Sequence, residues 1–260
     1  MTEQAQIDTL RTKAIAPRKL LIDGQLCDSE TGQTDNVISP LDGSVLTTTA
    51  AGSKGDTERA IAAARRAFDD KRWRGMPPAA RKKIMLRWAE LIEAEMLDLA
   101  VLGVRNNGTE IGMALKAEPG SAIATLRFYA EAIDKVYGEI APTPGDVLGL
   151  IHREPIGVVA AIIPWNFPLM IGAWKLAPAL AMGNSVVLKP AETASLSLLR
   201  LAEICSDCGL PDGVLNVVTG PGAVTGAALS EHMDVDVMVF TGSGATGRRL
   251  LEASARSNLK

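Results

Sequence analysis

The stretch GVVAAIIPWNFPLMIGAWKLAPALAMGNSVVLKPAE, residues 157–192, decides the fold of this chain. A predicted buried strand, Val158 to Ile163, runs into the segment PWNFP, whose two prolines end the strand and restrict the backbone around Asn166. A second predicted strand, Ser185 to Leu188, is followed by KPAE, which places Lys189 and Glu192 at its carboxyl end. Open α/β sheets bind ligands at that end of their strands. We therefore expect Asn166, Lys189 and Glu192 to belong to one site.

The composition is that of an ordinary globular protein that handles small molecules. The 260 residues allow one large domain or two small ones, and 47% of them are hydrophobic and 22% charged. The formal net charge of -3, without a dense basic run, argues against partners such as nucleic acid or an anionic membrane surface.

Membrane, secretory and metal-binding features are not expected. No apolar run approaches the ~18 residues of a membrane span, and the first residues lack the apolar centre of a signal peptide, so we expect a cytoplasmic protein. The three cysteines, Cys27, Cys205 and Cys208, are too few for a disulfide framework. Cys205 and Cys208 form a CxxC in a predicted helix, but no second Cys or His pair lies at metal-ligand spacing.

The first half of the chain is predicted to form short hairpins followed by helices. Residues 1–17 are polar and aperiodic, and we expect them to be loosely ordered. Turn signals at Asp23-Gly24 and Asp42-Gly43 predict hairpins. Helices are expected over 57–68, capped by Asp56, and over 78–102 and 121–137.

The second half predicts a parallel sheet. Strands expected near Gly157, Ser185, Val214 and Val235 alternate with helices over about 169–180, 195–208 and 224–232. Before them, residues 138–155 predict an extended hairpin arm, a place for contacts between subunits. The expected class is α/β: a Rossmann-like open parallel sheet with flanking helices, plus the β-hairpin arm.

The last predicted strand, Val235 to Phe240, leads into TGSGATG and a helix expected to begin near Arg248. This is a GxGxxG between strand and helix, a context that suits a bound phosphate. Alone it leaves two alternatives open: a glycine turn that serves packing only, or an alcohol dehydrogenase with an ordinary dinucleotide fold. Two features argue against an alcohol dehydrogenase. The motif follows the last predicted strand rather than the first, and the acidic residue that an ordinary dinucleotide fold has ~20 residues after the glycines would fall beyond Lys260.

Four motifs in order resemble the NAD(P)-dependent aldehyde dehydrogenase superfamily. They are PWNFP at 164–168, KPAE at 189–192, LPDGVLNVV at 210–218, and FTGS with Gly247 at 240–247. The segment RFYAEAIDKVYGEIAPT, residues 127–143, is similar to the branch that acts on ω-amino aldehydes, such as γ-glutamyl-γ-aminobutyraldehyde dehydrogenases. The resemblance implies that residues 1–260 are an NAD-binding domain, incomplete at its C-terminal end, and that the full-length form is a homo-oligomer.

By this resemblance Asn166 is the catalytic residue that donates its side-chain amide to the aldehyde oxygen as negative charge develops there. The alternative is an Asn that only caps the following helix. Lys189 and Glu192 would hold the adenosine ribose, which favours NAD over NADP because a carboxylate repels a 2′-phosphate. Alternatively they are a weak surface pair.

The remaining roles also come from the resemblance. The other residues assigned to the cofactor are Ile162, Ile163, Pro164, Trp165, Gly222, Gly242, Ser243 and Gly247. The residues assigned to an aldehyde tunnel are Phe167, Met170 and Trp174, all of which are also ordinary core residues by type. Glu110 and Glu118 could meet a cationic amine at the tunnel mouth, but a solvated helix face is the simpler expectation.

Two family motifs are not found among these residues: the QxC-type segment with the nucleophilic cysteine, and the ELGGK-like strand with the general-base glutamate. None of the three cysteines occupies a matching motif. We therefore expect the catalytic domain to be absent and this chain to be inactive alone. The alternative function is a stand-alone nucleotide-binding module without catalysis.

Overall fold

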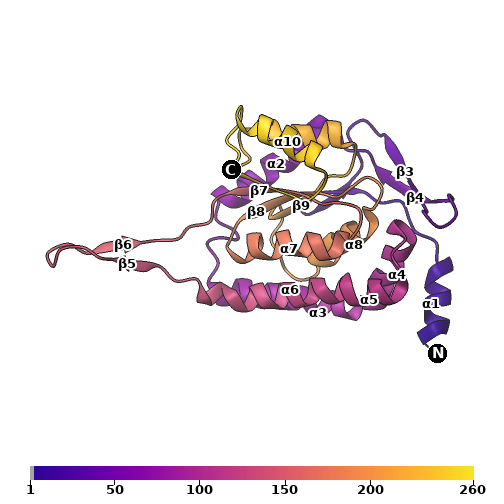
Figure 1. Ribbon diagram of the computed structural model, residues 1–260, viewed down its shortest axis with the longest axis horizontal. Helices are drawn as coiled ribbons and strands as arrows, with labels where there is room; N and C mark the ends of the chain where they lie inside the picture. The colour runs from indigo at the N-terminus through magenta and orange to yellow at the C-terminus, as the bar shows by residue number, and fades with distance from the viewer. Residues whose placement is uncertain (1–2) are drawn as a thin grey trace.

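The central sheet of the protein has the strand order β10-β7-β8-β9-β1-β2 in the computed structural model, which describes residues 3–260 (Figure 1). Its strands are β7 Val158–Ile162, β8 Ser185–Lys189, β9 Leu215–Val217, β10 Val237–Phe240, β1 Leu20–Ile22 and β2 Gln25–Cys27. The four strands β10, β7, β8 and β9 pair in parallel, as predicted. The N-terminal hairpin β1–β2 joins β9 antiparallel, so the sheet is mixed.

Helices cover both faces of this sheet (Figure 1). The helices are α1 Glu3–Thr12, α2 Lys54–Asp69, α3 Pro78–Ala94, α4 Met96–Asn107, α5 Ile111–Ala117, α6 Pro119–Ala132, α7 Pro168–Ala181, α8 Leu196–Ser206, α9 Ala227–Glu231 and α10 Gly244–Ser254. A 3-10 turn, Ile133–Lys135, follows α6, and a π-helical turn, Gly222–Gly226, precedes α9. Helices α7 and α8 pack between the sheet and an outer layer of α3 and α6.

The core consists of two hydrophobic clusters, one on each side of the sheet. The larger contains apolar residues of α3, α6, α7 and α8 together with one face of the strands, and includes the fully buried Trp73 and Trp88. Both indoles donate to backbone carbonyls, Trp73 to Leu180 at 2.8 Å and Trp88 to Leu201 at 3.1 Å, so neither buried N–H is left unpaired. The smaller cluster lies between α2 and the opposite face.

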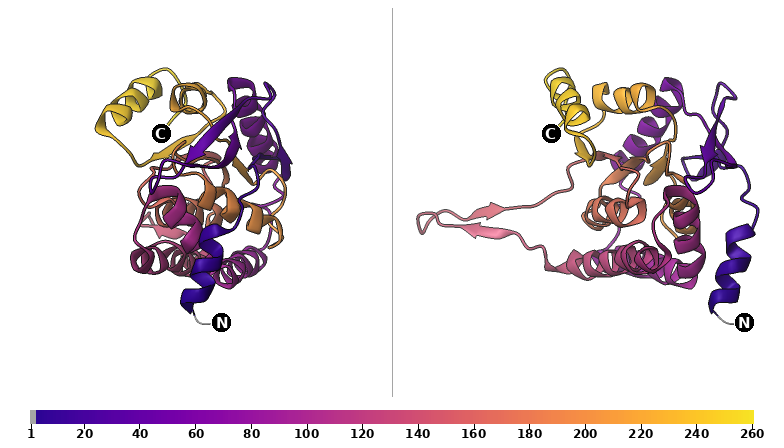
Figure 2. Two further views of the ribbon diagram at one scale, coloured as in Figure 1. Left: turned by 90° about the vertical axis from the view of Figure 1, so that its right-hand side faces the viewer. Right: turned by 45° about the vertical axis from the view of Figure 1, so that its right-hand side comes forward.

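The arm predicted over residues 138–155 is a two-stranded antiparallel hairpin, β5 Glu139–Ala141 and β6 Gly149–Ile151. It projects from the body at the end opposite to helix α1 (Figures 1 and 2). The other predicted hairpins also form: β1–β2 turns through Asp23 and Gly24, both at positive φ, and β3 Thr34–Ile38 pairs with β4 Val45–Ala50.

The expectation that residues 1–17 are loosely ordered is wrong over 3–12, where helix α1 forms. No residue of α1 is buried, so hydrophobic periodicity could not reveal it. Its C-terminal end is tied to α4 by side chains distant in sequence. Arg105 donates to the carbonyls of Leu10 and Lys13, and Lys13 pairs with Asp98 at 3.3 Å.

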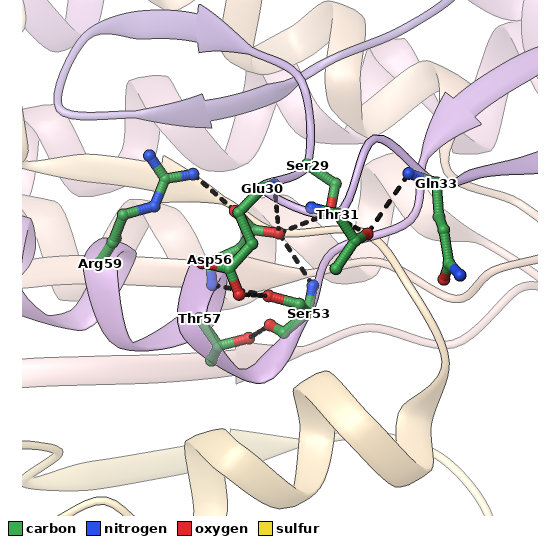
Figure 3. Close-up of polar contacts among 8 residues, drawn as sticks. All are labelled: Ser29, Glu30, Thr31, Gln33, Ser53, Asp56, Thr57 and Arg59. Atoms are coloured by element: carbon green, nitrogen blue, oxygen red, sulfur yellow. Dashed lines mark hydrogen bonds and ion pairs between the residues drawn. The ribbon is translucent and has the colours of Figure 1, made fainter.

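Helix α2 begins three residues before the predicted start because Ser53, not Asp56, is its N-cap. Ser53 and Asp56 form a capping box: the Ser53 hydroxyl accepts from Asp56 N at 3.0 Å, and the Asp56 carboxylate accepts from Ser53 N at 2.9 Å (Figure 3). Asp56 is fully buried and also accepts from the Ser29 hydroxyl and Glu30 N. Burial alone would raise the pKa of Asp56, but these hydrogen bonds outweigh it and hold the pKa below its ordinary value.

The long helix predicted over 78–102 is two helices, α3 and α4, separated at Glu95. The Glu95 carboxylate is held by Arg200 of helix α8, with Arg200 Nε 2.8 Å from Glu95 Oε2. The apolar periodicity continues through the break, which is why the sequence pattern did not show it. Helix α4 extends to Asn107 and ends at Gly108, which takes φ 79°.

Candidate functional site

A cleft of about 980 Å³ opens at the carboxyl ends of the parallel strands β7, β8 and β10. The predicted site residues that line it are Ile162, Ile163, Pro164, Trp165, Asn166, Lys189, Glu192, Gly222, Gly242 and Ser243. The remaining walls come from the π-helical turn, α9 and α10. The structure therefore brings the corner PWNFP, the segment KPAE and the glycine turn together around one opening, as expected for adjacent parallel strands.

Asn166 lies four residues after the end of β7 and one residue before the N-cap of helix α7. Its side chain is exposed on the cleft, and among residues 3–260 the side-chain amide has no hydrogen-bond partner. Its backbone carbonyl, in contrast, accepts from Asn107 Nδ2 at 3.1 Å. The corner thus fixes the main chain of Asn166 and leaves the amide N–H groups free to donate to a ligand.

Lys189 and Glu192 meet at the end of β8. Lys189 Nζ lies 3.6 Å from Glu192 Oε2, and Glu192 Oε1 accepts from Gly222 N at 2.6 Å. Lys189 is buried, and burial lowers the pKa of its ammonium even though Glu192 opposes the shift. Burial would raise the pKa of Glu192, but Lys189 and the Gly222 N–H outweigh it, so the pKa of Glu192 lies below its ordinary value. The site therefore presents a half-buried, ionised carboxylate.

The glycine turn differs in detail from the prediction, because helix α10 begins at Gly244 rather than near Arg248. Ser243 is its N-cap and accepts from Thr246 N at 3.2 Å. A Cβ at Gly242 would lie 2.5 Å from Cζ of Phe240, so a side chain at that position would force this ring to move. Gly247 lies inside α10 against the same ring and is not among the residues that line the cleft.

The three residues assigned to a substrate tunnel do not line the cleft: Phe167 is the N-cap of α7, and Met170 and Trp174 lie within that helix. Phe167 and Met170 pack partly against the larger core cluster. Trp174 is 52% exposed. Their role in substrate binding stays a prediction.

Two polar residues near the corner were missed or misjudged. Lys175 of α7 donates to Thr241 Oγ1 at 2.7 Å beside the cleft, and burial lowers its pKa. The expectation that Glu118 lies on a solvated helix face is wrong: it is 1% exposed, because the start of α7 packs onto the junction between α5 and α6. Glu110 is exposed and caps α5, where it accepts from Gly112 N and Met113 N.

The cysteines lie away from the cleft. Cys27 is on β2, the sheet edge opposite to β10, and Cys205 and Cys208 are buried in the larger cluster with their Sγ atoms 3.7 Å apart. Within residues 3–260, no group of three His, Cys, Asp or Glu side chains is placed to hold a metal ion. In the same part of the chain, no helix combines the length and the apolar character needed to cross a lipid bilayer.

Comparison with known proteins assigns almost the whole chain to the family that the sequence motifs resemble. The family model described as "Aldehyde dehydrogenase family" matches residues 27–260. The NADP/NAD-dependent aldehyde dehydrogenase PuuC of Escherichia coli is 46% identical over 242 residues, which are 93% of this chain and 49% of that protein. The aminoacetaldehyde dehydrogenase of Pseudomonas aeruginosa is 47% identical over 244 residues, 94% of this chain and 49% of that protein.

Solved structures share the fold closely. A P. syringae indole-3-acetaldehyde dehydrogenase, AldA, in complex with NAD⁺ and IAA superposes with a TM-score of 0.95 at 43% identity, covering 99% of this chain and 52% of that one. The γ-glutamyl-γ-aminobutyraldehyde dehydrogenase of Burkholderia cenocepacia gives a TM-score of 0.95 at 43% identity, covering 98% and 51%. The chain thus spans about half the length of the curated relatives it matches.

Proposed function

Because the chain belongs to the aldehyde dehydrogenase family, we propose that it provides the NAD-binding domain of an enzyme that oxidises an ω-amino aldehyde to a carboxylic acid. The observation that carries this proposal is the cleft itself. It joins an unpartnered amide, Asn166, to an ionised carboxylate, Glu192, and to the N-terminus of helix α10.

The residues of the cleft fit a dinucleotide. The Glu192 carboxylate has lone pairs left to accept from a ribose diol, since its partners within residues 3–260 are one backbone N–H and Lys189. The N-terminus of α10, at Ser243, favours the negative charge of a pyrophosphate. When bound, NAD would supply the hydride acceptor of the oxidation. The carboxylate at position 192 supports NAD rather than NADP as the preferred cofactor.

Asn166 is the catalytic residue of this proposal. Its side-chain N–H groups would donate to the aldehyde oxygen, whose negative charge increases when a nucleophile attacks the carbonyl carbon. Removing one such donor typically costs about 2.7–4 kcal/mol of transition-state stabilisation. Because the backbone carbonyl of Asn166 is already held by Asn107, the amide would meet the oxyanion with little reorganisation.

The substrate class rests on relatives rather than on a contact in the structure. The aminoacetaldehyde and γ-glutamyl-γ-aminobutyraldehyde dehydrogenases named above support an ω-amino aldehyde. Phe167, Met170 and Trp174 would line its path along α7. The nucleophile is not proposed from Cys27, Cys205 or Cys208, since none lines the cleft, and we propose that this chain alone does not turn over aldehydes.

We also propose that the arm contacts a second copy of the chain. Three of its large apolar side chains, Ile140, Leu148 and Leu150, are exposed on a hairpin that extends away from the body (Figure 2). An exposed apolar ribbon with free strand edges is a pairing surface, which makes a homo-oligomer the expected assembly.

Calorimetric titration of the 260-residue chain with NAD⁺ and NADP⁺ tests the cofactor proposal. We expect binding of NAD⁺, tighter than that of NADP⁺, and a loss of about tenfold or more in NAD⁺ affinity for Glu192→Ala, because a charge-assisted hydrogen bond is worth about 1.5–3 kcal/mol. Glu252→Ala, an exposed carboxylate of α10 outside the cleft, is the matched control. No NAD⁺ binding, or equal losses in the two variants, would refute the proposal.

A further inference from the structure

Asn107 and Glu118 connect the helix pair α4–α6 to the corner that carries Asn166. Asn107 Nδ2 donates to Asn166 O at 3.1 Å and lies 3.5 Å from Glu118 Oε1. The other carboxylate oxygen, Glu118 Oε2, accepts from Met170 N at 2.9 Å. The Asn107 orientation is fixed in turn, because its Oδ1 accepts from Thr109 N at 3.0 Å. A continuous hydrogen-bonded path therefore runs from the carbonyl of Asn166 to the N–H of Met170.

These two backbone groups are four residues apart, the spacing of a helical hydrogen bond. If α7 began one residue earlier, Met170 N would donate to Asn166 O. Instead, the first helical bond of α7 runs from Ile171 N to Phe167 O at 3.0 Å, and the side chains of Glu118 and Asn107 bond separately to the two groups. These two side chains therefore provide hydrogen-bond partners for Met170 N and Asn166 O, and Asn166 stays outside the helix.

Helix α7 lacks a local cap, which explains why a distant carboxylate is needed. Its N-cap Phe167 has no side-chain acceptor, and Pro168 at the first position has no N–H to donate. Glu118, at the α5–α6 junction, caps α7 by accepting from one of the N–H groups of its first turn. A carboxylate at a helix N-terminus is also stabilised by the helix dipole. Burial nevertheless raises the pKa of Glu118 to about 7, against the N–H groups of Met170 and Leu169, which lower it. A carboxyl group buried at such a cost indicates a specific requirement at this corner.

We infer that Asn107 and Glu118 are positioning residues, which hold the Asn166 corner so that the side-chain amide faces the cleft. The inference rests on the proposed function, in which that amide is the oxyanion donor. Neither residue lines the cleft, so neither is assigned a contact with substrate or cofactor. Their effect passes through the carbonyl of Asn166 and the first turn of α7.

The test measures Asn166 directly by NMR on the ¹⁵N-labelled 260-residue chain, with its signals assigned by comparison with Asn166→Ala. At about pH 8, where the Glu118 carboxyl is ionised, Glu118→Gln replaces the acceptor oxygen that faces Asn107 Nδ2 by an NH₂ group, so Asn107 is displaced from Asn166 O. We expect the backbone order parameter at Asn166 to fall from about 0.85 to below about 0.6. Asn107→Ala, at a half-buried position, should change Asn166 in the same way even if Glu118→Gln fails to fold.

Ile92→Val is the control for a general loss of stability, since Ile92 is fully buried in the larger cluster and belongs to α3. It should leave the Asn166 signals unchanged. Unchanged Asn166 dynamics in Asn107→Ala, or an equal change in Ile92→Val, would overturn the inference. The readout needs neither cofactor nor turnover, so a chain that does not bind NAD⁺ would refute the proposed function without altering this result.

Discussion

Replacing Glu118 with glutamine is expected to remove a pH-dependent component of stability. Burial raises the pKa of Glu118 to about 7 in the folded protein, above its ordinary value of 4.5. No ion pair to it is present among residues 3–260 that could reverse the shift. Between these two pH values the folded protein keeps a proton on Glu118 that the unfolded chain has already released.

The sign of the effect follows from this proton balance. Because the folded state binds more protons than the unfolded state in this window, the unfolding free energy falls as the pH rises through it. The contribution is fully present below about pH 4.5 and is lost above about pH 7. The difference between the two pKa values corresponds to roughly 3 kcal/mol. The glutamine of the variant does not titrate, so the variant lacks this component.

Urea unfolding of the wild type and Glu118→Gln between about pH 4.5 and pH 8.5 measures the effect. The unfolding free energy of the variant, relative to the wild type, should rise by roughly 3 kcal/mol across this range. Glu110→Gln is the matched control in the neighbouring helix. The N–H groups of Gly112 and Met113 lower the pKa of Glu110, so its contribution to stability is lost only as the pH falls below about 4.5, and the difference between Glu110→Gln and the wild type should stay nearly constant across the measured range.

The reasoning fails if the difference between Glu118→Gln and the wild type stays constant within about 0.5 kcal/mol from pH 5 to pH 8, the scatter of ordinary surface substitutions. That result would mean that Glu118 is ionised throughout and is as well solvated as in the unfolded chain.

Two further predictions concern the glycine turn and the arm. In urea unfolding, Gly242→Ala should lower the unfolding free energy by about 1 kcal/mol or more, because the new Cβ would overlap the Phe240 ring. Gly244→Ala should be neutral or stabilising in the same measurement, because its Cβ meets only Arg248 Nη1 at 3.7 Å. A loss in Gly244→Ala as large as in Gly242→Ala would contradict this steric explanation. Leu150→Asp should weaken self-association about tenfold or more in light scattering, since burying a leucine contributes about 1.5–3 kcal/mol. Leu251→Asp, at an equally exposed position on α10, should not, and equal effects would remove the arm from the interface.

Local sequence signals were sufficient for the order of the elements in the second half of the chain and for the hairpins. The alternation of strands and helices after residue 156 predicted the parallel pairing of β7, β8, β9 and β10, and the Asp23-Gly24 turn predicted the first hairpin. The corner PWNFP and the segment KPAE predicted which side chains would meet at the strand ends. These signals work because turn chemistry and hydrophobic period depend on neighbouring residues only.

Features that depend on distant residues were missed. Helix α1 has no buried face and is fixed by Arg105, while the break at Glu95 coincides with its bond to Arg200. The late expected start of α10 near Arg248 has a local cause instead: Ser243, inside the glycine turn, is the N-cap of the helix.

By itself, the sequence determined that the second half of this chain forms a parallel α/β unit with Asn166, Lys189 and Glu192 just after neighbouring strands. Only the tertiary structure decided that Glu118 is buried, because the Met170 N–H that it caps lies 52 residues away in the chain and is brought close by packing of α7 against the α5–α6 junction. Periodicity records which face of a helix is apolar, but it does not record what that face will meet.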